Sequence, residues 1–221
     1  MHPGINGPKF KDKPAIIMAG SGDIITHQEL NELSNQGAQL FRSLGLKPGD
    51  SLAFMMENHK LFFPIAFAAY RSGLKYTAIS WRLQANEVEY IVKDCGAKVF
   101  ITSKFLEESA KSLANSLQGV HKFMLDGITD DFKSYEEQIN KMPTTPIEDE
   151  CQGAAMLYSS GTTGKPKGVS REINLNPLPY KAEEDDLGLT RVVQGLYSAD
   201  ENSIYLSPAP LYHSAPMGFN T

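Results

Sequence analysis

The sequence has 221 residues, of which 41% are hydrophobic and 21% are charged, and its formal net charge at pH 7 is −5. These values are ordinary for a globular protein of one large domain or two small ones, and they exclude a disordered or fibrous chain. Because no excess of basic residues is available to neutralise a phosphate backbone, nucleic acid is not an expected partner.

Cysteine usage and hydropathy favour a reducing, cytoplasmic location. The only two cysteines, Cys95 and Cys151, form no C-x-x-C pair, so neither a disulfide framework nor a zinc site is expected. The amino terminus lacks a charged segment followed by an apolar one, so no export signal is predicted. The longest apolar run, residues 61–70, is too short to cross a bilayer, so no transmembrane segment is predicted.

The first two thirds of the chain alternate short apolar runs with amphipathic helices. A capping box from Thr26 to Glu29 predicts the start of the first long helix, and Gly45 predicts its end. Such alternation is typical of βαβ crossovers, so we predict an α/β fold with a mostly parallel sheet covered by helices. Strands are expected over residues 15–19, 52–56, 76–80, 98–102 and 122–125, and further helices over residues 61–72, 86–94, 104–117 and 134–142.

Residues 143–153 carry two prolines and show no hydrophobic periodicity. This stretch is the best candidate for a subdomain boundary, and it reads equally well as one long connection within a domain. The apolar run over residues 154–157 then predicts a strand that leads into the most distinctive stretch of the chain.

That stretch is residues 158–169, with the sequence Tyr-Ser-Ser-Gly-Thr-Thr-Gly-Lys-Pro-Lys-Gly-Val. Its glycines allow positive φ angles and a close approach of the backbone to an anion, while its hydroxyls and lysines add donors and positive charge. We therefore predict a phosphate-binding loop at the end of a strand. The candidate phosphate-binding residues are Ser159, Ser160, Gly161, Thr162, Thr163, Gly164, Lys165, Lys167 and Gly168.

Two alternative interpretations explain this loop less well. A Walker A loop needs a glycine five residues before Gly164 and a Ser or Thr after Lys165, where this chain has Ser159 and Pro166. A flexible surface linker accounts for the Gly, Ser and Thr residues, but not for the Lys-Pro-Lys-Gly that follows them or the apolar strand before them.

Beyond the loop, residues 171–186 read as irregular, and their acidic run 183–186 reads as a solvated face rather than a metal site. A helix is expected over residues 187–198. A strand is expected over residues 203–209, ending at a prolyl turn with an aromatic residue and a histidine and with no further element to cover it.

Residues 159–168 resemble at every position the signature of the adenylate-forming superfamily, roughly Ser/Thr-Ser/Thr-Gly-Ser/Thr-Thr-Gly-x-Pro-Lys-Gly. In that superfamily the loop holds the pyrophosphate part of ATP while a carboxylate attacks the α-phosphate, which gives an acyl-adenylate. The resemblance covers essentially the whole chain, including residues 46–50, 71–76 and 208–216. Within the superfamily, the chain looks most like the acyl-CoA ligases. This resemblance implies ATP, Mg²⁺ and CoA, a small carboxylic acid as substrate, and Thr162 as a metal ligand.

Residues 211–214, Leu-Tyr-His-Ser, are similar to the acyl-CoA ligase segment that lies beside the substrate carboxylate and the adenylate. The resemblance implies that His213 and its aromatic neighbour shape the mouth of the acyl pocket, whereas a histidine taken alone is more often structural. Amino-acid-activating members would place an aspartate here, and residues 203–221 contain no Asp or Glu. A fatty or cyclic carboxylic acid without an α-amino group is therefore the expected substrate.

Two features depart from the family pattern. Residues 170–174, Ser-Arg-Glu-Ile-Asn, lack the Thr-His-x-Asn that commonly follows the loop, which leaves the subfamily open. The sequence also lacks the family's adenine-contacting segment, ribose-binding aspartate, hinge and C-terminal domain with its adenylation lysine. We therefore expect residues 1–221 to form an incomplete N-terminal AMP-binding domain that is inactive by itself. The alternatives are a non-catalytic nucleotide-binding module and an aryl-acid or peptide-synthetase type of adenylation without CoA.

Overall fold

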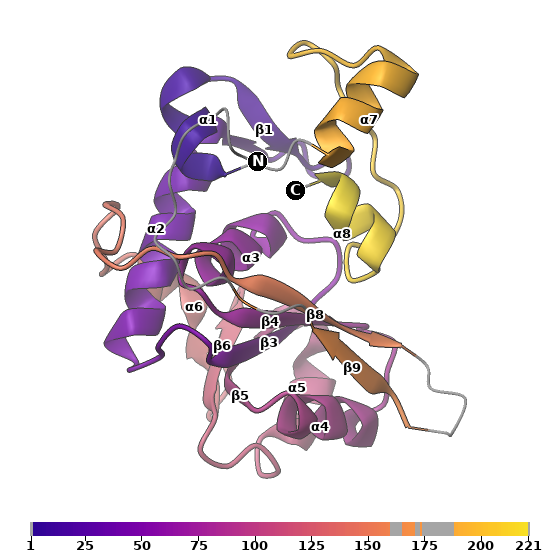
Figure 1. The fold of residues 1–221 in the computed structure, drawn as a ribbon. Helices are drawn as coiled ribbons and strands as arrows, with labels where there is room; N and C mark the ends of the chain where they lie inside the picture. Colours follow the sequence, from indigo (N-terminus) through magenta and orange to yellow (C-terminus); the bar gives the residue numbers. More distant parts are fainter. Residues whose placement is uncertain (1, 160–164, 171–172, 174–187, 221) are drawn as a thin grey trace.

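The computed structural model describes residues 2–159, 165–170, 173 and 188–220. Its centre is a seven-stranded sheet in the order β7-β6-β5-β3-β4-β8-β9. Every neighbouring pair is parallel except the last, β8 with β9, which is antiparallel. Helices cover both faces of the sheet (Figure 1). The predicted α/β fold with a mostly parallel sheet is confirmed.

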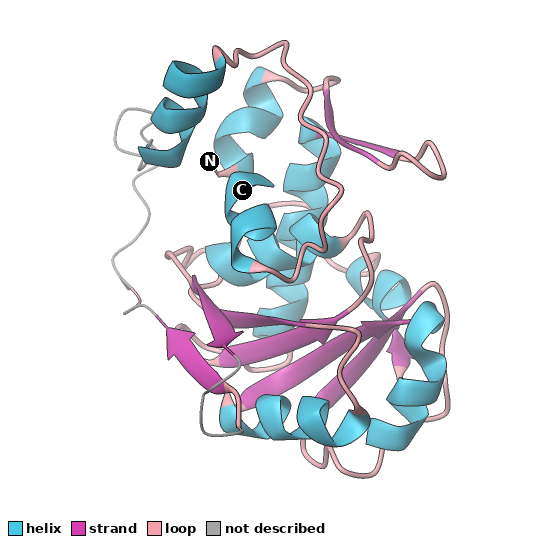
Figure 2. Cartoon of the chain, turned by 90° about the vertical axis from the view of Figure 1, so that its right-hand side faces the viewer, coloured by secondary structure: helices cyan, strands magenta, loops and turns pink. Residues whose placement is uncertain are grey.

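The strands of this sheet are β3 (Ser51–Met55), β4 (Lys75–Ile79), β5 (Ala97–Ser103), β6 (His121–Leu125), β7 (Lys133–Ser134), β8 (Ala154–Ser159) and β9 (Lys167–Ser170). A separate hairpin of β1 (Pro14–Ile17) and β2 (Ile24–Thr26) projects from the helical half of the molecule (Figure 2). The helices are α1 (Pro3–Lys9), α2 (His27–Ser43), α3 (Phe62–Arg71), α4 (Ala85–Asp94), α5 (Glu107–Leu113), α6 (Tyr135–Ile139), α7 (Gly188–Tyr197) and α8 (Ser214–Asn220).

Strand β3 shows why a continuous apolar run lies at the centre of the sheet. Leu52 and Phe54 pack in the apolar cluster that contains α2 and α3, whereas Ala53 and Met55 pack in the cluster that contains α4 and α5. Successive side chains of a strand point to opposite faces, so a strand covered on both faces must be apolar throughout.

Helix α2 begins and ends where its sequence signals predict. The N–H of Thr26 donates to the Glu29 carboxylate (2.7 Å), and the N–H of Glu29 donates to the Thr26 hydroxyl (3.2 Å), which completes the capping box. After Ser43 the chain leaves the helix, and Gly45 adopts a positive φ of 82°. The predicted capping box and the glycine stop are confirmed.

Residues 143–153 run along α2 before the chain enters β8. The Asn35 side chain donates to the backbone carbonyl of Thr144 (2.6 Å), and Arg71 at the end of α3 forms an ion pair with Glu150 (2.6 Å). The Arg71 side chain is 1% exposed and the Glu150 side chain 9%, so this pair is held inside the structure. These contacts fix the entry of β8, the strand that carries the predicted loop.

His2 is buried beside Arg71, and this burial makes the stability of the fold sensitive to acid. The His2 Nδ1 accepts a hydrogen bond from the N–H of Gly4 (3.0 Å) at the start of α1. Burial, and after it the charge of Arg71, lowers the pKa of His2 from 6.5 to about 3. Because the folded pKa lies below the unfolded one, the unfolded chain binds the extra proton first. Stability is therefore complete above pH 6.5 and falls as the pH drops from 6.5 towards 3.

We expect His2 alone to lower the free energy of unfolding by about 2 kcal/mol at pH 5 relative to pH 7.5. His2→Asn keeps an acceptor for the Gly4 N–H but does not titrate, so its stability should depend less on pH by that amount. Urea denaturation of both proteins at several pH values measures the difference. Parallel stability curves for the two proteins would refute the assignment.

The predicted strand over residues 203–209 is wrong. Residues 203–208 have no regular secondary structure, and the side chains of Ile204, Tyr205 and Leu206 are 86%, 62% and 74% exposed. A strand needs a partner for its backbone N–H and C=O groups, and none of the described strands pairs with this segment. The apolar residues of this segment favour a strand, but a favourable propensity is not enough without a neighbouring strand to pair with.

Other differences concern the ends of the chain and the shorter helices. Helix α1, strand β9 and helix α8 were not predicted, and α8 follows the prolyl turn where no covering element was expected. The helix predicted over residues 104–117 is shorter, because a 3₁₀ turn (Lys104–Leu106) precedes α5, and α6 is also shorter than predicted. The acidic run 183–186 lies outside the described residues. Among the helices in the described ranges, none combines the length and the apolarity needed to cross a membrane.

Candidate active site

The predicted phosphate-binding loop connects the antiparallel strands β8 and β9. Ser159, the last residue of β8, pairs with Lys167, the first residue of β9, so these two exposed residues stand on either side of the base of the loop. A Walker A loop leads into a helix, whereas this loop leads into a strand. Ser160, Gly161, Thr162, Thr163 and Gly164, among them the predicted metal ligand, lie outside the described residues.

Helix α4 holds this hairpin from the side. The Tyr158 hydroxyl donates to the Asp94 carboxylate (2.5 Å), and the Tyr90 hydroxyl donates to the carbonyl of Pro166 (3.3 Å). The Lys165 ammonium lies 5.4 Å from the centre of the Tyr90 ring, within the range of a cation–π contact. Burial, and then the hydrogen bond to Asp94, raises the pKa of Tyr158, so its hydroxyl remains a donor at neutral pH.

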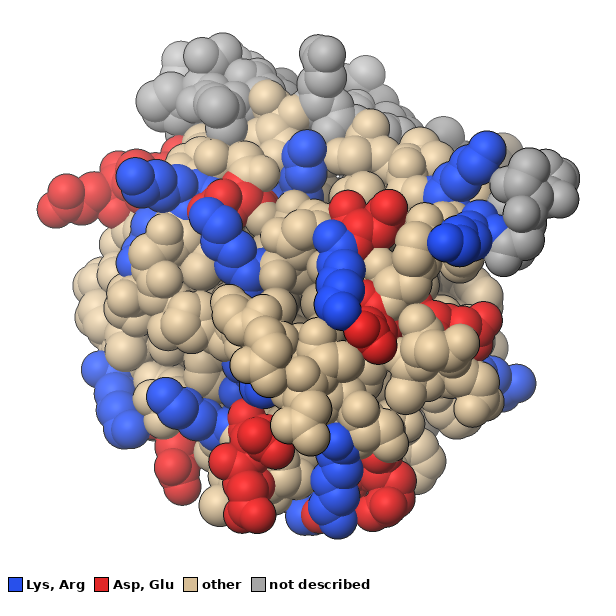
Figure 3. All heavy atoms as spheres, turned by 90° about the horizontal axis from the view of Figure 1, so that it is seen from below, with Lys and Arg blue, Asp and Glu red and all other residues tan. Residues whose placement is uncertain are grey.

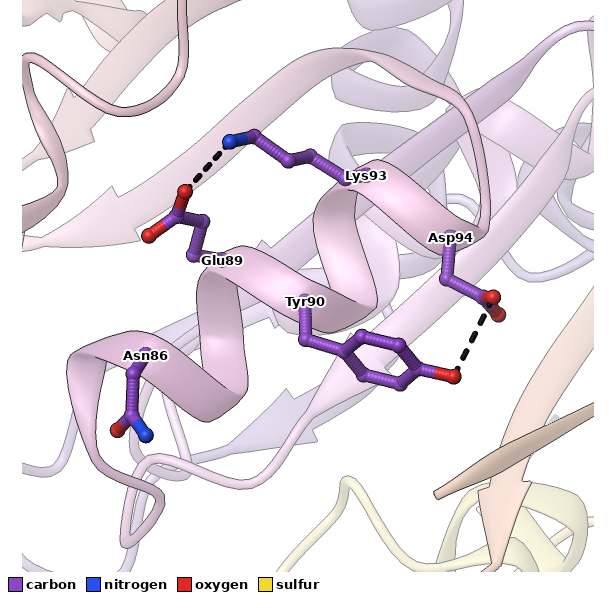
Figure 4. A pocket seen from close by; sticks show the side chains of 5 residues that line it. All are labelled: Asn86, Glu89, Tyr90, Lys93 and Asp94. Atoms are coloured by element: carbon purple, nitrogen blue, oxygen red, sulfur yellow. Dashed lines mark hydrogen bonds and ion pairs between the residues drawn. The ribbon is translucent and has the colours of Figure 1, made fainter. Parts of the chain in front are cut away.

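The face of α4 beside the hairpin is an open groove of about 470 Å³, lined by Asn86, Glu89, Tyr90, Lys93 and Asp94. In Figure 4 the Lys93 side chain reaches Glu89, and the Tyr90 hydroxyl reaches Asp94. Lys93 pairs with Glu89, and Asp94 accepts from Tyr90 in the groove and from Tyr158 in the hairpin, so we assign the groove to anchoring the hairpin and not to binding a substrate.

At Gly168 the absence of a side chain matters for packing, and the backbone does not adopt an unusual conformation. Its φ angle lies outside the left-handed region, so the freedom to adopt a positive φ is not used at this position. It pairs with Tyr158 across the hairpin, and an added Cβ would meet the Met156 side chain and come within 3.1 Å of the Tyr158 hydroxyl. A side chain at this position would displace the end of Met156 and press against the Tyr158 ring, so glycine gives the closest packing of the hairpin.

Lys167 and Lys165 differ in what they contact. Lys165 stacks on Tyr90, whereas Lys167 forms no ion pair with any described residue. A lysine at the base of the loop that has no ion pair among the described residues is suited to phosphate oxygens. Of the two lysines, Lys167 is therefore the better placed to meet an anion held by the loop.

The predicted prolyl turn lies at the end of β3. Leu211 is buried in the main apolar cluster, and the next two residues, Tyr212 and His213, have their ring centres 4.5 Å apart. His213 is exposed, its N–H donates to the Pro210 carbonyl (3.2 Å), and α8 begins directly after it. The turn is thus anchored by an apolar side chain and presents an aromatic pair at the surface.

Loop and turn lie at the same edge of the sheet. Strands β3, β4 and β8 are parallel, so the residues that follow β3 and the loop that follows β8 both lie at the carboxyl edge, with β4 between them. In open α/β sheets this edge is where ligands bind. The described contacts do not join His213 directly to Ser159, Lys165, Lys167 or Gly168, so a ligand would have to span the two parts.

The charged side chains of the described residues gather neither into a patch of one sign on the face seen from below (Figure 3) nor into a metal site. On the face seen from below, positive and negative side chains are interspersed and produce no field of a single sign (Figure 3). Within residues 2–159, 165–170, 173 and 188–220, no cluster of three or more His, Cys, Asp or Glu side chains is arranged to hold a metal ion.

Asn58 and Asp94, which contact the two candidate parts of the site, were not singled out from the sequence. Asn58 bonds to the turn at Ala209 and Leu211, and Asp94 bonds to Tyr158 beside the loop. A signal was present for Asn58, because it follows the apolar run that forms β3 and therefore had to lie at the carboxyl edge. Asp94 is the last residue of α4, and its position in the sequence does not indicate a contact with the loop.

Comparison with known proteins decides the family. The profile of the AMP-binding enzyme family matches residues 6–221, which is nearly the whole chain. The chain belongs to this family. The resemblance to the adenylate-forming superfamily, carried by residues 159–168, is thereby confirmed, and the relatives of the chain include a feruloyl-CoA synthase and an oxalate–CoA ligase.

Three similar proteins illustrate the range of these relatives. The chain is 28% identical to a feruloyl-CoA synthase of an Amycolatopsis species over 92% of its length, which is 38% of that protein. It is 28% identical to the fatty acid–[acyl-carrier-protein] ligase ScoC of Streptomyces coeruleorubidus over 71% of the chain and 29% of ScoC. The crystal structure of the anthranilate CoA ligase AuaEII with anthranoyl-AMP superposes with a TM-score of 0.68 at 24% identity, over 76% of this chain and 33% of AuaEII. The chain therefore spans about a third of these relatives.

Proposed function

We propose that the complete gene product containing these residues is an AMP-forming acyl-CoA ligase acting on a fatty or cyclic carboxylic acid. The observation that carries this proposal is the β8–β9 hairpin, which pairs Ser159 with Lys167 at the base of the loop that carries the adenylate-forming signature. The relatives named for feruloyl-CoA and anthranoyl-AMP support a carboxylic acid substrate. We further propose that residues 1–221 form the N-terminal part of the AMP-binding domain.

In the proposed reaction, a carboxylate oxygen of the acid attacks the α-phosphorus of ATP while the bond to the β-phosphate oxygen breaks. Lys167 and the loop residues 159–164 hold the leaving pyrophosphate and stabilise its developing negative charge. The thiolate of CoA then attacks the carbonyl carbon of the acyl-adenylate, forming the thioester and releasing AMP. No base is needed in the first step, because the acid is already ionised at pH 7.

Mg²⁺ fits this loop better than a site made of carboxylates. The described residues contain no acidic cluster for it, and Mg²⁺ commonly takes substrate phosphates and water together with few protein ligands. We propose that the Thr162 hydroxyl is such a ligand. When bound, the ion would neutralise charge on the phosphates.

A cytoplasmic location belongs to the same proposal. Cys95 and Cys151 are free thiols and both are buried, and ATP and CoA are cytoplasmic substrates. The free thiols support a reducing compartment.

The test of the proposed function is acid-dependent release of pyrophosphate by the purified gene product with ATP, Mg²⁺ and a panel of fatty and aryl acids. We expect thioester and AMP to form only when CoA is also present. Transfer of the acyl group to an acyl carrier protein, with none to CoA, would favour the alternative that the similarity to ScoC suggests. Nucleotide binding without any acid-dependent pyrophosphate release would instead identify a non-catalytic module.

His213→Ala should change how the protein binds the acid more than how it binds ATP. The His213 ring is exposed, lies against the Tyr212 ring at a tilt of 52° and has no proton to transfer in the proposed reaction. We expect KM for the preferred acid to rise by about three- to tenfold and the preference among acids to change, with KM for ATP within about twofold of the parent. Steady-state kinetics over the acid panel measures this. Identical constants for every acid would remove His213 from the acyl site.

The 221-residue chain by itself should form no acyl-CoA. The hairpin supplies contacts to the phosphate tail, whereas in this superfamily the grip on adenine and ribose and the adenylation lysine come from segments that these residues do not include. Mass spectrometry of chain incubated with ATP, Mg²⁺, CoA and the acid panel checks this. Acid-dependent AMP and thioester above a Lys167→Ala control would show that these residues suffice.

A further inference from the structure

Three consecutive side chains after β3 each bind a distant part of the chain. The Ser103 hydroxyl at the end of β5 donates to the Glu57 carboxylate (2.6 Å). The His59 Nε2 lies 3.0 Å from the carboxylate of Asp126, which follows β6. Asn58, between them, bonds to the prolyl turn. The connection from β3 to α3 is therefore tied to the carboxyl ends of two neighbouring strands.

The hydrogen bonds of His59 fix its orientation. The N–H of Leu61 donates to His59 Nδ1 (3.1 Å), so this nitrogen is the acceptor, and Nε2 carries the proton that is donated to Asp126. With Glu57 held on one side and His59 on the other, the backbone of Asn58 has little freedom to turn. Its side-chain amide is thus preorganised to meet a partner.

That partner is the backbone on both sides of Pro210. The Asn58 amide nitrogen donates to the carbonyl of Ala209 (3.0 Å), and its oxygen accepts from the N–H of Leu211 (2.9 Å). One side chain therefore uses its donor and its acceptor at once to hold a segment more than 150 residues away in the sequence. Such a pair of bonds fixes both the distance and the rotation of the turn.

Tyr212 and His213 follow this clamp directly. On its far side Met217 in α8 is buried in the same apolar cluster as Leu211, so the chain is held before and after the two rings. Neither ring is buried, so their positions are set by these flanking contacts instead of by close packing around them.

We infer that Asn58 is a positioning residue, which sets where Tyr212 and His213 stand against the carboxylic acid. The inference rests on the proposed function, in which this turn borders the acid. It places no group of Asn58 on the reacting atoms and gives Asn58 no role in holding ATP.

The first arm of the test examines the clamp without using activity. Hydrogen exchange of the complete gene product, resolved to the Leu211 amide, compares the parent with Asn58→Ala and Asn58→Asp. Both variants should exchange this amide faster, Asn58→Ala by about tenfold, because its acceptor is gone. Asn58→Asp keeps an acceptor for Leu211 but sets a carboxylate oxygen against the Ala209 carbonyl. Unchanged exchange in β3 shows that the fold is retained.

The second arm measures kinetics over the acid panel. Asn58→Ala should raise KM for the preferred acid by about three- to tenfold and alter the preference among acids, with KM for ATP within about twofold of the parent. Asn115→Asp is the matched control, because Asn115 is exposed in the connection that precedes β6, at the opposite edge of the sheet. It should match the parent in both arms.

The two arms separate failure of the clamp from failure of the function. Unchanged exchange of Leu211 in Asn58→Ala overturns the clamp. Faster exchange with unchanged constants for every acid overturns the positioning role and leaves the proposed function standing. A parent protein that releases no pyrophosphate with any acid overturns the proposed function and the positioning role together, while the exchange data still decide whether Asn58 holds the turn.

Discussion

Lys167→Ala should lower acid-dependent pyrophosphate release by the complete gene product by about 10²- to 10³-fold, with little loss of stability. The expected loss corresponds to about 2–4 kcal/mol of transition-state stabilisation, the usual effect of removing a charged contact to a leaving group in a site that excludes water. Lys167 is exposed and unpaired among the described residues, so its truncation leaves no buried charge behind. Its backbone pairs with Ser159, which places residue 167 at the base of the loop.

Lys133→Ala is the matched control. Lys133 is also exposed and also begins a short strand, but β7 forms the opposite end of the sheet order. This variant should retain the parent's rate within about twofold. If Lys167→Ala released pyrophosphate at the rate of Lys133→Ala, the hairpin would not be the phosphate-binding element.

Gly153→Ala should destabilise the fold by about 3 kcal/mol. An added Cβ would run into the carbonyl oxygen of Leu74 and would lie 2.9 Å from both the Ala69 carbonyl oxygen and the Leu74 nitrogen. All three are backbone atoms at the turn from α3 to β4, so no side-chain rotation relieves the contact. The Gly153 N–H also donates to the Tyr70 carbonyl (2.6 Å), which fixes the chain where it enters β8.

Gly20→Ala is the control for this substitution. Nothing lies within 4 Å of a Cβ at Gly20, and its φ is not positive, so we expect its free energy of unfolding to stay within about 0.5 kcal/mol of the parent. Urea denaturation of the 221-residue chain measures both variants. A Gly153→Ala protein as stable as Gly20→Ala would show that the start of β8 has room for a Cβ beside the α3–β4 turn.

Helices and strands that depend on residues close together in the sequence could be predicted from the sequence. Helix α2 depends on a capping box whose two members are three residues apart, and β3 is a run of apolar residues that suits a strand buried on both faces. Helix α1 shows the limit, because Pro3, Gly4, Gly7 and Pro8 disfavour a helix on propensity. Packing against α2, where Gly7 lies close to Asn31, outweighs that preference.

The site divides in the same way. The loop could be predicted because the glycines, hydroxyls and lysines that indicate phosphate binding all lie within residues 159–168. The partners of Asn58 and Asp94 could not be predicted, because only the folded sheet brings them near: Tyr158 is 64 residues from Asp94, and Leu211 is more than 150 residues from Asn58. The prediction of a strand over residues 203–209 was wrong for the same reason. Whether a segment forms a strand depends on a neighbouring strand to pair with, and the sequence of the segment does not show whether one is near.

The central claim is that a carboxylate of the substrate attacks the α-phosphate, and an isotope experiment tests it most directly. The complete gene product is incubated with ATP, Mg²⁺, CoA and an acid carrying ¹⁸O in both carboxylate oxygens. One carboxylate oxygen becomes bonded to phosphorus, and the thiolate later attacks the carbonyl carbon, so that oxygen stays with AMP. We predict AMP carrying one ¹⁸O, and none when unlabelled acid is used in ¹⁸O water. Unlabelled AMP from the labelled acid would contradict the account.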